Sequence, residues 1–274
     1  METLSIEEIL GLIFGLLILG LSPFGFAAYW RLFKQVTTGE AKVHTASLRL
    51  PELFLAFLLI TMFLGLLFEA LRAEPKKFEE INLVDGSIFY VVIVGIIAAF
   101  LQMRGNRILS LFGFDAMRIP EALRRAIALT LAAFPIVVLI TMVVQLLPGL
   151  KGDRQEIVQF FEAATKNADT ARMVVTIFLA TIIAPVAEEF IFRGFLYGVT
   201  KRYTGIIGGM VFTSAIFAAI HLNLPSFPAL FVLAVCLNIA YEHTGSIVVP
   251  MVMHALFNFT QLVLIYLVAQ TSIA

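Results

Sequence analysis

The chain has 274 residues, of which 60% are hydrophobic and 14% are charged, and its mean hydropathy is +0.97. This composition is far more apolar than that of a soluble globular domain, so it predicts a polytopic membrane protein embedded in a lipid bilayer. The formal net charge is zero, which gives no reason to expect nucleic acid as a partner. The single cysteine, Cys236, excludes an intramolecular disulfide framework.

Eight apolar runs approach the length of about 20 residues that a helix needs to cross a hydrocarbon core of about 30 Å. We therefore expect an all-α, polytopic transmembrane helix bundle of about eight spans. The runs are Ile9–Trp30, Phe54–Leu71, Ile88–Met103, Ile127–Leu147, Met173–Tyr197, Gly205–His221, Phe227–Tyr241 and Ile247–Val268. The first four carry no recognisable motif, so we divide the chain into an N-terminal part, residues 1–150, and a C-terminal part, residues 151–274.

Two connecting segments differ from plain loops. Phe112–Arg125 mixes apolar and basic residues, which indicates an elbow at the membrane interface. Lys151–Asp169 has apolar residues at helical spacing, so it is either an amphipathic helix lying on the membrane or a solvated loop.

Basic residues in the loops predict the orientation, because cytoplasmic loops are enriched in Lys and Arg. Of the 19 Lys and Arg residues, eleven follow odd-numbered spans, seven follow even-numbered spans, and Arg193 lies within a span. Both termini are therefore predicted to lie outside. The eleven are Arg31, Lys34, Lys42, Arg49, Arg104, Arg107, Arg118, Arg124, Arg125, Lys201 and Arg202; the seven are Arg72, Lys76, Lys77, Lys151, Arg154, Lys166 and Arg172.

The fifth apolar run contains Glu188, Glu189 and Arg193. Charges inside a span are costly and are usually retained where they pair or do chemistry. On a helix, Glu189 and Arg193 are i,i+4 neighbours and form an ion pair in the favourable order. Glu188 lies about 100° round the helix, so this pair leaves it unneutralised. Pro185, just upstream, predicts a kink beside the carboxylates.

Three further polar residues lie in later spans: His221 ends the sixth, and His254 and Asn258 share one face of the eighth. At about 1.5 Å of rise per residue, Glu188 lies roughly 21 Å from Arg202, at a depth that overlaps those of the other three. Each residue alone is consistent with a hydrogen bond that only joins helices. Their concentration in the last part of the chain favours one intramembrane polar cavity.

Three motifs in chain order resemble those of the CPBP family, which includes the type 2 CAAX prenyl proteases and bacteriocin-processing proteases and is also called the Abi family. They are Glu188-Glu189-x-x-x-Arg193, Phe217-x-x-x-His221 and His254-x-x-x-Asn258, and the resemblance extends over about Met173–Asn258. It implies an intramembrane endopeptidase whose catalytic core is residues 151–274. It also implies the cell membrane of a prokaryote as the location.

The resemblance also assigns roles. Glu188 is expected to be the base that activates water, and His221 to help position that water. His254 and Asn258 are expected to stabilise the oxyanion, while Glu189 and Arg193 hold the helix geometry. Peptide hydrolysis independently requires a base and donors directed at developing negative charge. The substrate is expected to be a membrane protein or peptide, such as a prenylated tail, a bacteriocin leader or a membrane-bound regulator.

Two alternatives remain open. No cofactor is expected for a glutamate mechanism, but Glu188, His221 and His254 form a set that could bind zinc. A zinc protease of the HExxH type is disfavoured because that motif is absent from the sequence. A non-enzymatic transporter or bacteriocin immunity protein would also place polar groups at the membrane midplane, although the sequence shows no matching half-repeats. No feature specifies an oligomeric state.

Overall fold

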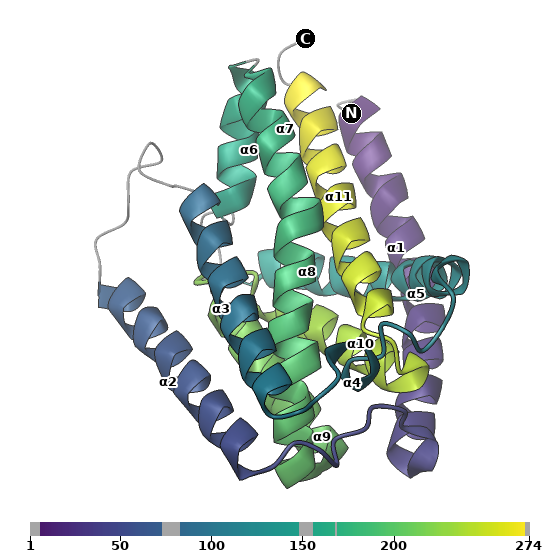
Figure 1. Ribbon diagram of the computed structural model, residues 1–274. Coiled ribbons are helices and arrows are strands. Elements are labelled where there is room, and N and C mark those ends of the chain that lie inside the picture. Colours follow the sequence, from purple (N-terminus) through teal and green to yellow (C-terminus); the bar gives the residue numbers. More distant parts are fainter. Residues whose placement is uncertain (1–5, 73–82, 148–155, 168, 272–274) are drawn as a thin grey trace.

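The computed structural model describes residues 6–72, 83–147, 156–167 and 169–271, and every regular element in these ranges is a helix (Figure 1). The first half contains α1 (Ile6–Gln35), η1 (Val36–Glu40), α2 (Leu50–Arg72), α3 (Leu83–Met103), α4 (Ile108–Leu111) and α5 (Ile119–Gln145). The second half contains α6 (Glu156–Lys166), α7 (Thr170–Phe178), η3 (Leu179–Ile183), α8 (Ala184–Glu189), η4 (Phe190–Tyr197), α9 (Gly198–Ala219), α10 (Phe227–Thr244) and α11 (Val248–Thr271).

Seven helical stretches among the described residues are long and apolar enough to cross a membrane, and one of them runs for 50 residues from Thr170 to Ala219. A straight helix of that length would be about 75 Å long, more than twice the hydrocarbon thickness. Gly205 interrupts it with φ 78° and ψ 177°, a conformation that glycine adopts readily. The stretch therefore corresponds to the fifth and sixth predicted spans, and eight spans result. The start of α1 and the end of α11 lie at one end of the bundle, as an even number of crossings requires (Figure 1).

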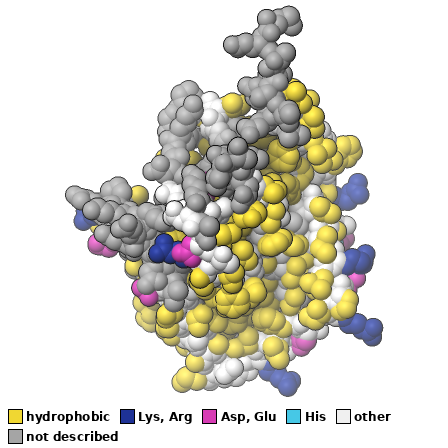
Figure 2. All heavy atoms as spheres, turned by 90° about the horizontal axis from the view of Figure 1, so that it is seen from above, with side chains coloured by type: hydrophobic (Ala, Val, Ile, Leu, Met, Phe, Trp, Pro, Cys, Tyr) yellow, Lys and Arg dark blue, Asp and Glu magenta, His cyan; other side chains and the backbone are white. Residues whose placement is uncertain are grey.

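The all-α membrane bundle predicted from composition is confirmed, and its lipid-facing surface explains the high hydropathy. Large apolar side chains are exposed along most helices; on α2, Leu50 is 71% exposed, Phe54 63% and Phe57 62%. In Figure 2, hydrophobic side chains make up most of the described surface that is visible. Such a continuous apolar surface requires lipid rather than water as the solvent.

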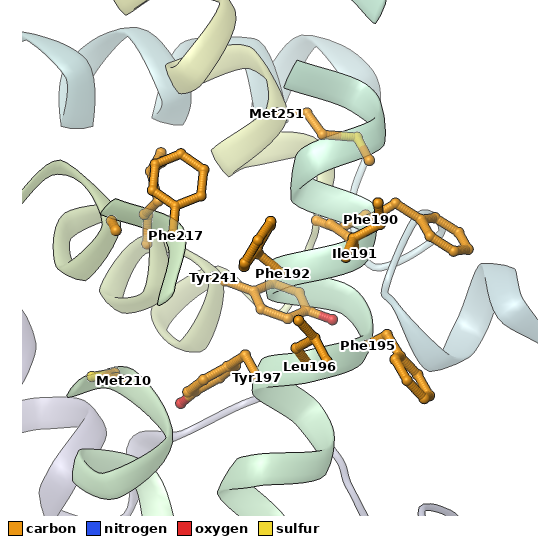
Figure 3. Packing of buried hydrophobic residues seen from close by; sticks show 14 of the residues in the cluster. Phe190, Ile191, Phe192, Phe195, Leu196, Tyr197, Met210, Phe217, Tyr241 and Met251 are labelled. Carbon is orange, nitrogen blue, oxygen red and sulfur yellow. The ribbon is translucent and has the colours of Figure 1, made fainter. Parts of the chain in front are cut away.

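The core of the bundle forms around η4, whose eight residues are all buried. Figure 3 shows apolar side chains of η4 on both sides of this segment, with Phe192 on the side of Phe217 of α9 and Tyr241 of α10. Phe192 makes an edge-to-face contact with Phe217 at a centroid distance of 5.3 Å, and Phe190 makes one with Phe112 at 4.9 Å. Edge-to-face pairs contribute about 0.5–1.5 kcal/mol each beyond their area burial. The second motif is thus fixed against the first by aromatic packing.

The N-terminal spans pack closely on this core. At Gly25 of α1, a Cβ atom would lie 2.3 Å from the carbonyl oxygen of Ala132 in α5. The absent side chain therefore lets the two backbones approach, as small residues do between membrane helices. The predicted elbow contains a turn followed by the start of α5. Its first residue, Phe112, is buried, and the Phe112 carbonyl oxygen accepts a hydrogen bond from the backbone N–H of Ile247 at 3.1 Å.

The predicted amphipathic segment is helical between Glu156 and Lys166, so the loop alternative is wrong for these residues. Its apolar face is buried against the protein, because Phe161 packs with Ala180 of η3 and Leu262 of α11. The expectation that this face lies on the membrane is therefore wrong for these residues. Residues 151–155 and 168 of the segment and the proposed division at residue 150 lie outside the described residues.

The loops that follow odd-numbered spans gather at one end of the bundle, where α1 leads into α2 and α3 leads into α4 (Figure 1). Gly205 reverses the chain at the same end. Four of the basic residues counted for the opposite end, Lys76, Lys77, Lys151 and Arg154, lie outside the described residues. The assignment of one end to the cytoplasm stays a prediction.

Candidate active site

The two glutamates lie on α8, a short α-helix between two π-helical segments, η3 and η4. Pro185 occupies the beginning of α8, directly after η3. Proline lacks the N–H that would continue an α-helical hydrogen-bond ladder, and a widened turn relieves that conflict. The kink predicted at Pro185 therefore takes the form of a π-helical turn. Such turns occur frequently at functional sites.

Glu189 is fully buried and binds two partners through one oxygen. Arg193 Nη1 donates to Glu189 Oε1 at 2.9 Å, so the predicted i,i+4 ion pair is present. His254 Nδ1 of α11 lies 2.9 Å from the same oxygen. Since a carboxylate only accepts at this contact, the proton lies on Nδ1. Glu189 thus fixes both the guanidinium on its own helix and the imidazole on a neighbouring helix.

Arg193 is 1% exposed and its other contacts are also internal. Arg193 Nη2 donates to the carbonyl oxygen of Ala234 in α10 at 3.4 Å, and the guanidinium carbon lies 4.4 Å from the centre of the Phe217 ring. The ring face is electron-rich and attracts a cation. The guanidinium therefore joins the fifth, sixth and seventh spans.

Glu188 has a different environment from its neighbour. Its side chain is 9% exposed, and Oε2 has no hydrogen-bond partner among the described residues. The nearest basic side chain that the structure gives is His254, whose Nε2 lies 3.9 Å from Glu188 Oε2. That separation is longer than a hydrogen bond. The expectation that Glu188 remains unpaired while Glu189 is paired agrees with these contacts.

His221 lies at the end of α9 and is partly buried. Its Nδ1 lies 2.7 Å from the carbonyl oxygen of Phe217, which can only accept, so Nδ1 carries a proton, and in the neutral imidazole the lone pair is on Nε2. The Phe217 ring contacts both imidazoles, with centroid distances of 4.8 Å to His221 and 5.8 Å to His254. The sixth and eighth spans therefore bring both histidines to the same aromatic ring.

Asn258 is one helical turn beyond His254 on α11 and is partly buried. Its Nδ2 donates to the carbonyl oxygen of Ala180 in η3 at 2.8 Å. This bond holds α11 against the segment that precedes the glutamates. One amide N–H of Asn258 remains beyond this bond, because the amide nitrogen carries two.

The set Glu188, His221 and His254 was the predicted alternative for a zinc site. Among the described residues, no group of three or more His, Cys, Asp or Glu side chains has the proximity needed to hold a metal ion. His254 Nδ1 is also committed to Glu189, so only Nε2 of this ring faces Glu188. The zinc alternative stays a prediction.

Two other buried polar groups were not foreseen from the sequence. Glu242 of α10 is fully buried; it accepts from Tyr197 Oη at 2.6 Å and forms an ion pair with Lys201. Asn238 donates to Ser214 Oγ at 3.1 Å, joining α10 to α9. Glu242 falls one residue beyond the predicted seventh span, and Lys201 was counted as a loop residue. The sequence signal that could have located Asn238 is its position as a lone amide inside an apolar run.

Comparisons with known proteins agree with this arrangement. Residues 170–260, which include all four candidate catalytic residues, match the family described as type II CAAX prenyl endopeptidase Rce1-like. The chain is also 24% identical over 155 residues to the membrane-embedded CAAX protease MroQ of Staphylococcus aureus (strain USA300). That match covers 52% of this chain and 59% of the relative, so the chain spans about three fifths of the relative's length. No solved structure matches.

These similarities support the resemblance to CPBP-family membrane proteases that the three sequence motifs indicated. The matched residues begin with α7 and end in α11, so they contain η3, α8, η4, His221 just after α9, and His254 of α11. The first four spans lie outside the matched residues. The similarity thus coincides with the part of the molecule in which the buried polar groups converge.

Proposed function

We propose that this protein is an intramembrane endopeptidase that uses Glu188 to activate water for hydrolysis of a peptide bond in a membrane-associated protein or peptide. One observation carries the proposal. Glu188 is a largely buried carboxylate without a hydrogen-bond partner on Oε2, and it faces an imidazole whose other nitrogen is fixed by a buried ion pair. A purely structural carboxylate in an apolar span would be expected to be paired.

In the proposed reaction, Glu188 removes a proton from water while the water oxygen attacks the carbonyl carbon of the scissile bond. A new C–O bond forms, and the carbonyl oxygen becomes an oxyanion. The C–N bond then breaks, and the proton held by Glu188 passes to the departing amine. The products are a carboxylate and an amine, and no oxidant or cofactor is consumed. His221, with its Nε2 lone pair, accepts a hydrogen bond from the same water.

His254 and Asn258 are the proposed oxyanion donors. Because His254 Nδ1–H is committed to Glu189, its Nε2 donates a hydrogen bond only when the ring is an imidazolium. Glu189 stabilises that charged ring as the acidic member of a catalytic triad stabilises its histidine. Asn258 supplies the amide N–H that its bond to Ala180 leaves available. Donors in a buried site stabilise an oxyanion more strongly than donors in water.

The proposed substrate class follows from the similarity to CAAX endopeptidases. We propose a membrane-associated peptide, with a prenylated C-terminal tail as the first candidate. A prenyl chain would remain among the apolar spans while the peptide bond reaches the glutamates. We also propose that the protein lies in the cell membrane, with the end that carries most basic loops in the cytoplasm and both termini outside.

A single-turnover assay with purified protein in lipid nanodiscs tests the proposal. The substrates are a farnesylated CAAX-type peptide, the same peptide without the lipid, and a peptide pool from membranes of cells lacking the protein. Wild-type protein should cleave at least one of them, and Glu188→Gln should lower the rate by about 10²–10⁴. Glu69→Gln is the matched control, because Glu69 is an exposed carboxylate on α2. A folded Glu188→Gln variant with full activity would overturn the proposal.

A further inference from the structure

A pocket of about 430 Å³ lies away from the glutamates, between the ends of α2, α3 and α9. Three arginines line it: Arg49 directly before α2, Arg104 directly after α3, and Arg202 just before the reversal at Gly205. Each arginine is thus at the end of a membrane-spanning helix. Because the ends of spans lie at the boundary between hydrocarbon and headgroups, the pocket lies at headgroup depth.

The charges around the pocket do not balance. Arg104 Nε is 3.2 Å from Oε1 of Glu52, a buried carboxylate, so this pair is close to neutral. Glu52 Oε2 accepts from the backbone N–H of Arg49 at 2.7 Å, and this contact leaves the Arg49 guanidinium uncommitted. Neither Arg49 nor Arg202 has a side-chain ion pair within the part of the chain that the structure describes. Two exposed guanidinium groups therefore share one pocket with no internal acid for either.

The walls beside these charges are apolar and exposed. Leu50 is 71% exposed and also lines the pocket, and Phe54, one turn further along α2, is 63% exposed. On α9, Tyr203 lines the pocket at 46% exposure and Ile207 follows at 55%. On α2 the apolar side chains continue from the basic end of the span towards its middle, and beyond Gly205 the exposed Ile207 stands at the start of the next span. A ligand in this pocket meets cations at one end and a lipid-facing surface at the other.

We propose that this pocket binds the phosphate of an anionic phospholipid, with its acyl chains lying along α2 and α9. A guanidinium group donates two parallel hydrogen bonds to a phosphate, which suits Arg49 and Arg202. Basic pockets between span ends bind anionic headgroups through the same charge complementarity. Tyr203 adds an amphipathic ring at the depth where aromatic side chains are enriched in membrane proteins. The site is independent of the proposed peptidase activity.

The experiment uses the purified full chain in a nonionic detergent. Dioleoyl phosphatidylglycerol and dioleoyl phosphatidylcholine are titrated separately, and retained lipid is counted by native mass spectrometry alongside the thermal unfolding temperature. Wild-type protein should retain phosphatidylglycerol and unfold at a higher temperature with it than with phosphatidylcholine. The double variant R49Q/R202Q should bind phosphatidylglycerol about 30-fold more weakly, from the loss of two basic side chains near a headgroup.

The matched control is R31Q/R107Q, which removes the same charge from exposed arginines outside the pocket and should bind phosphatidylglycerol as the wild type does. Equal weakening in both double variants would show diffuse attraction and overturn the site. Unchanged binding in R49Q/R202Q would overturn it as well. If that variant does not fold, Arg49→Gln and Arg202→Gln alone should each weaken binding about fivefold, and no change in either contradicts the proposal.

Inorganic phosphate and glycerol 1-phosphate form the second arm of the test. If the acyl chains contribute as proposed, neither compound should raise the unfolding temperature at concentrations where phosphatidylglycerol does. Protection by free phosphate equal to that by the lipid would identify a soluble anion as the ligand and overturn the lipid assignment. Displacement of bound phosphatidylglycerol by a peptide carboxylate would instead identify a peptide terminus as the occupant.

Discussion

Replacing Glu189 by glutamine should destabilise the protein far more than the same replacement at Glu188. In Glu189→Gln, the buried guanidinium of Arg193 loses its charged partner, while its contacts with the Ala234 carbonyl oxygen at 3.4 Å and with the face of the Phe217 ring remain. Leaving one partner of a buried ion pair without the other costs about 3–5 kcal/mol. Glutamine still offers an amide oxygen to Arg193 and His254, so the lower end of that range is expected.

Glu188→Gln should change the free energy of unfolding by less than about 1 kcal/mol. Its Oε2 has no hydrogen-bond partner among the described residues, and the nearest basic group that the structure gives, on His254, is 3.9 Å away. The amide has the shape of the carboxylate, so no cavity forms, and no buried cation is left without a partner. Adjacent glutamates of the same helix should therefore differ by at least about 2 kcal/mol, a factor of about 30 in the folding equilibrium.

The measurement is denaturant unfolding of each variant in the same detergent, monitored by circular dichroism, together with the folded yield. The double variant E189Q/R193M provides a further check, since it removes both charges. It should be more stable than Glu189→Gln alone, because no unpaired charge remains buried. Equal destabilisation by Glu188→Gln and Glu189→Gln would refute the reasoning, because it would mean that both carboxylates hold the fold.

Three further predictions concern the candidate catalytic residues. Asn258→Ala should lower the single-turnover rate by about 10²–10³ through loss of an oxyanion donor. The free energy of unfolding should fall by only about 1 kcal/mol, because one hydrogen bond to Ala180 is lost. A rate unchanged from wild type contradicts this role. His221→Ala should lower the rate by about 10²–10⁴ in the same assay with the fold retained, and retention of full activity would leave His221 as a helix-end contact only. Treatment with excess chelator should leave the cleavage rate unchanged, while mass spectrometry measures the metal that remains bound to the protein. Activity that is lost and then restored by added zinc would favour the metal alternative.

The local part of the site was predictable because helical periodicity determines it. Residues four apart on a helix are neighbours whatever surrounds them, so the pairing of Glu189 with Arg193 follows from the sequence alone. The convergence of the three motifs was also predictable, because the rise per residue places them at similar depths in the membrane. The contacts of α11 with α8 and of α9 with η4 and α11 agree with that expectation.

The contacts that depend on helix rotation were not predictable. A sequence shows that His254 and Asn258 share a face, but not which of two adjacent glutamates that face will meet. In the structure His254 Nδ1 bonds Glu189 and Asn258 bonds the backbone of η3. The π-helical turns that set this rotation leave only Pro185 as a local signal. Amphipathic spacing likewise does not reveal whether lipid or protein covers an apolar face, which is why the surroundings of α6 differ from expectation.

The charge balance of the site gives a physical reason for a pair of glutamates where one base would suffice. A lone carboxylate beside Arg193 would form the ion pair itself and would then be a poor base, because its negative charge would be satisfied by the guanidinium. Glu189 forms that pair and also fixes His254 Nδ1, so Glu188 stays without a hydrogen bond on Oε2. Glu188, Glu189 and Arg193 then carry a net charge of −1, which a protonated His254 would neutralise. The second carboxylate thus leaves the first one available for the proposed proton transfer within an apolar span.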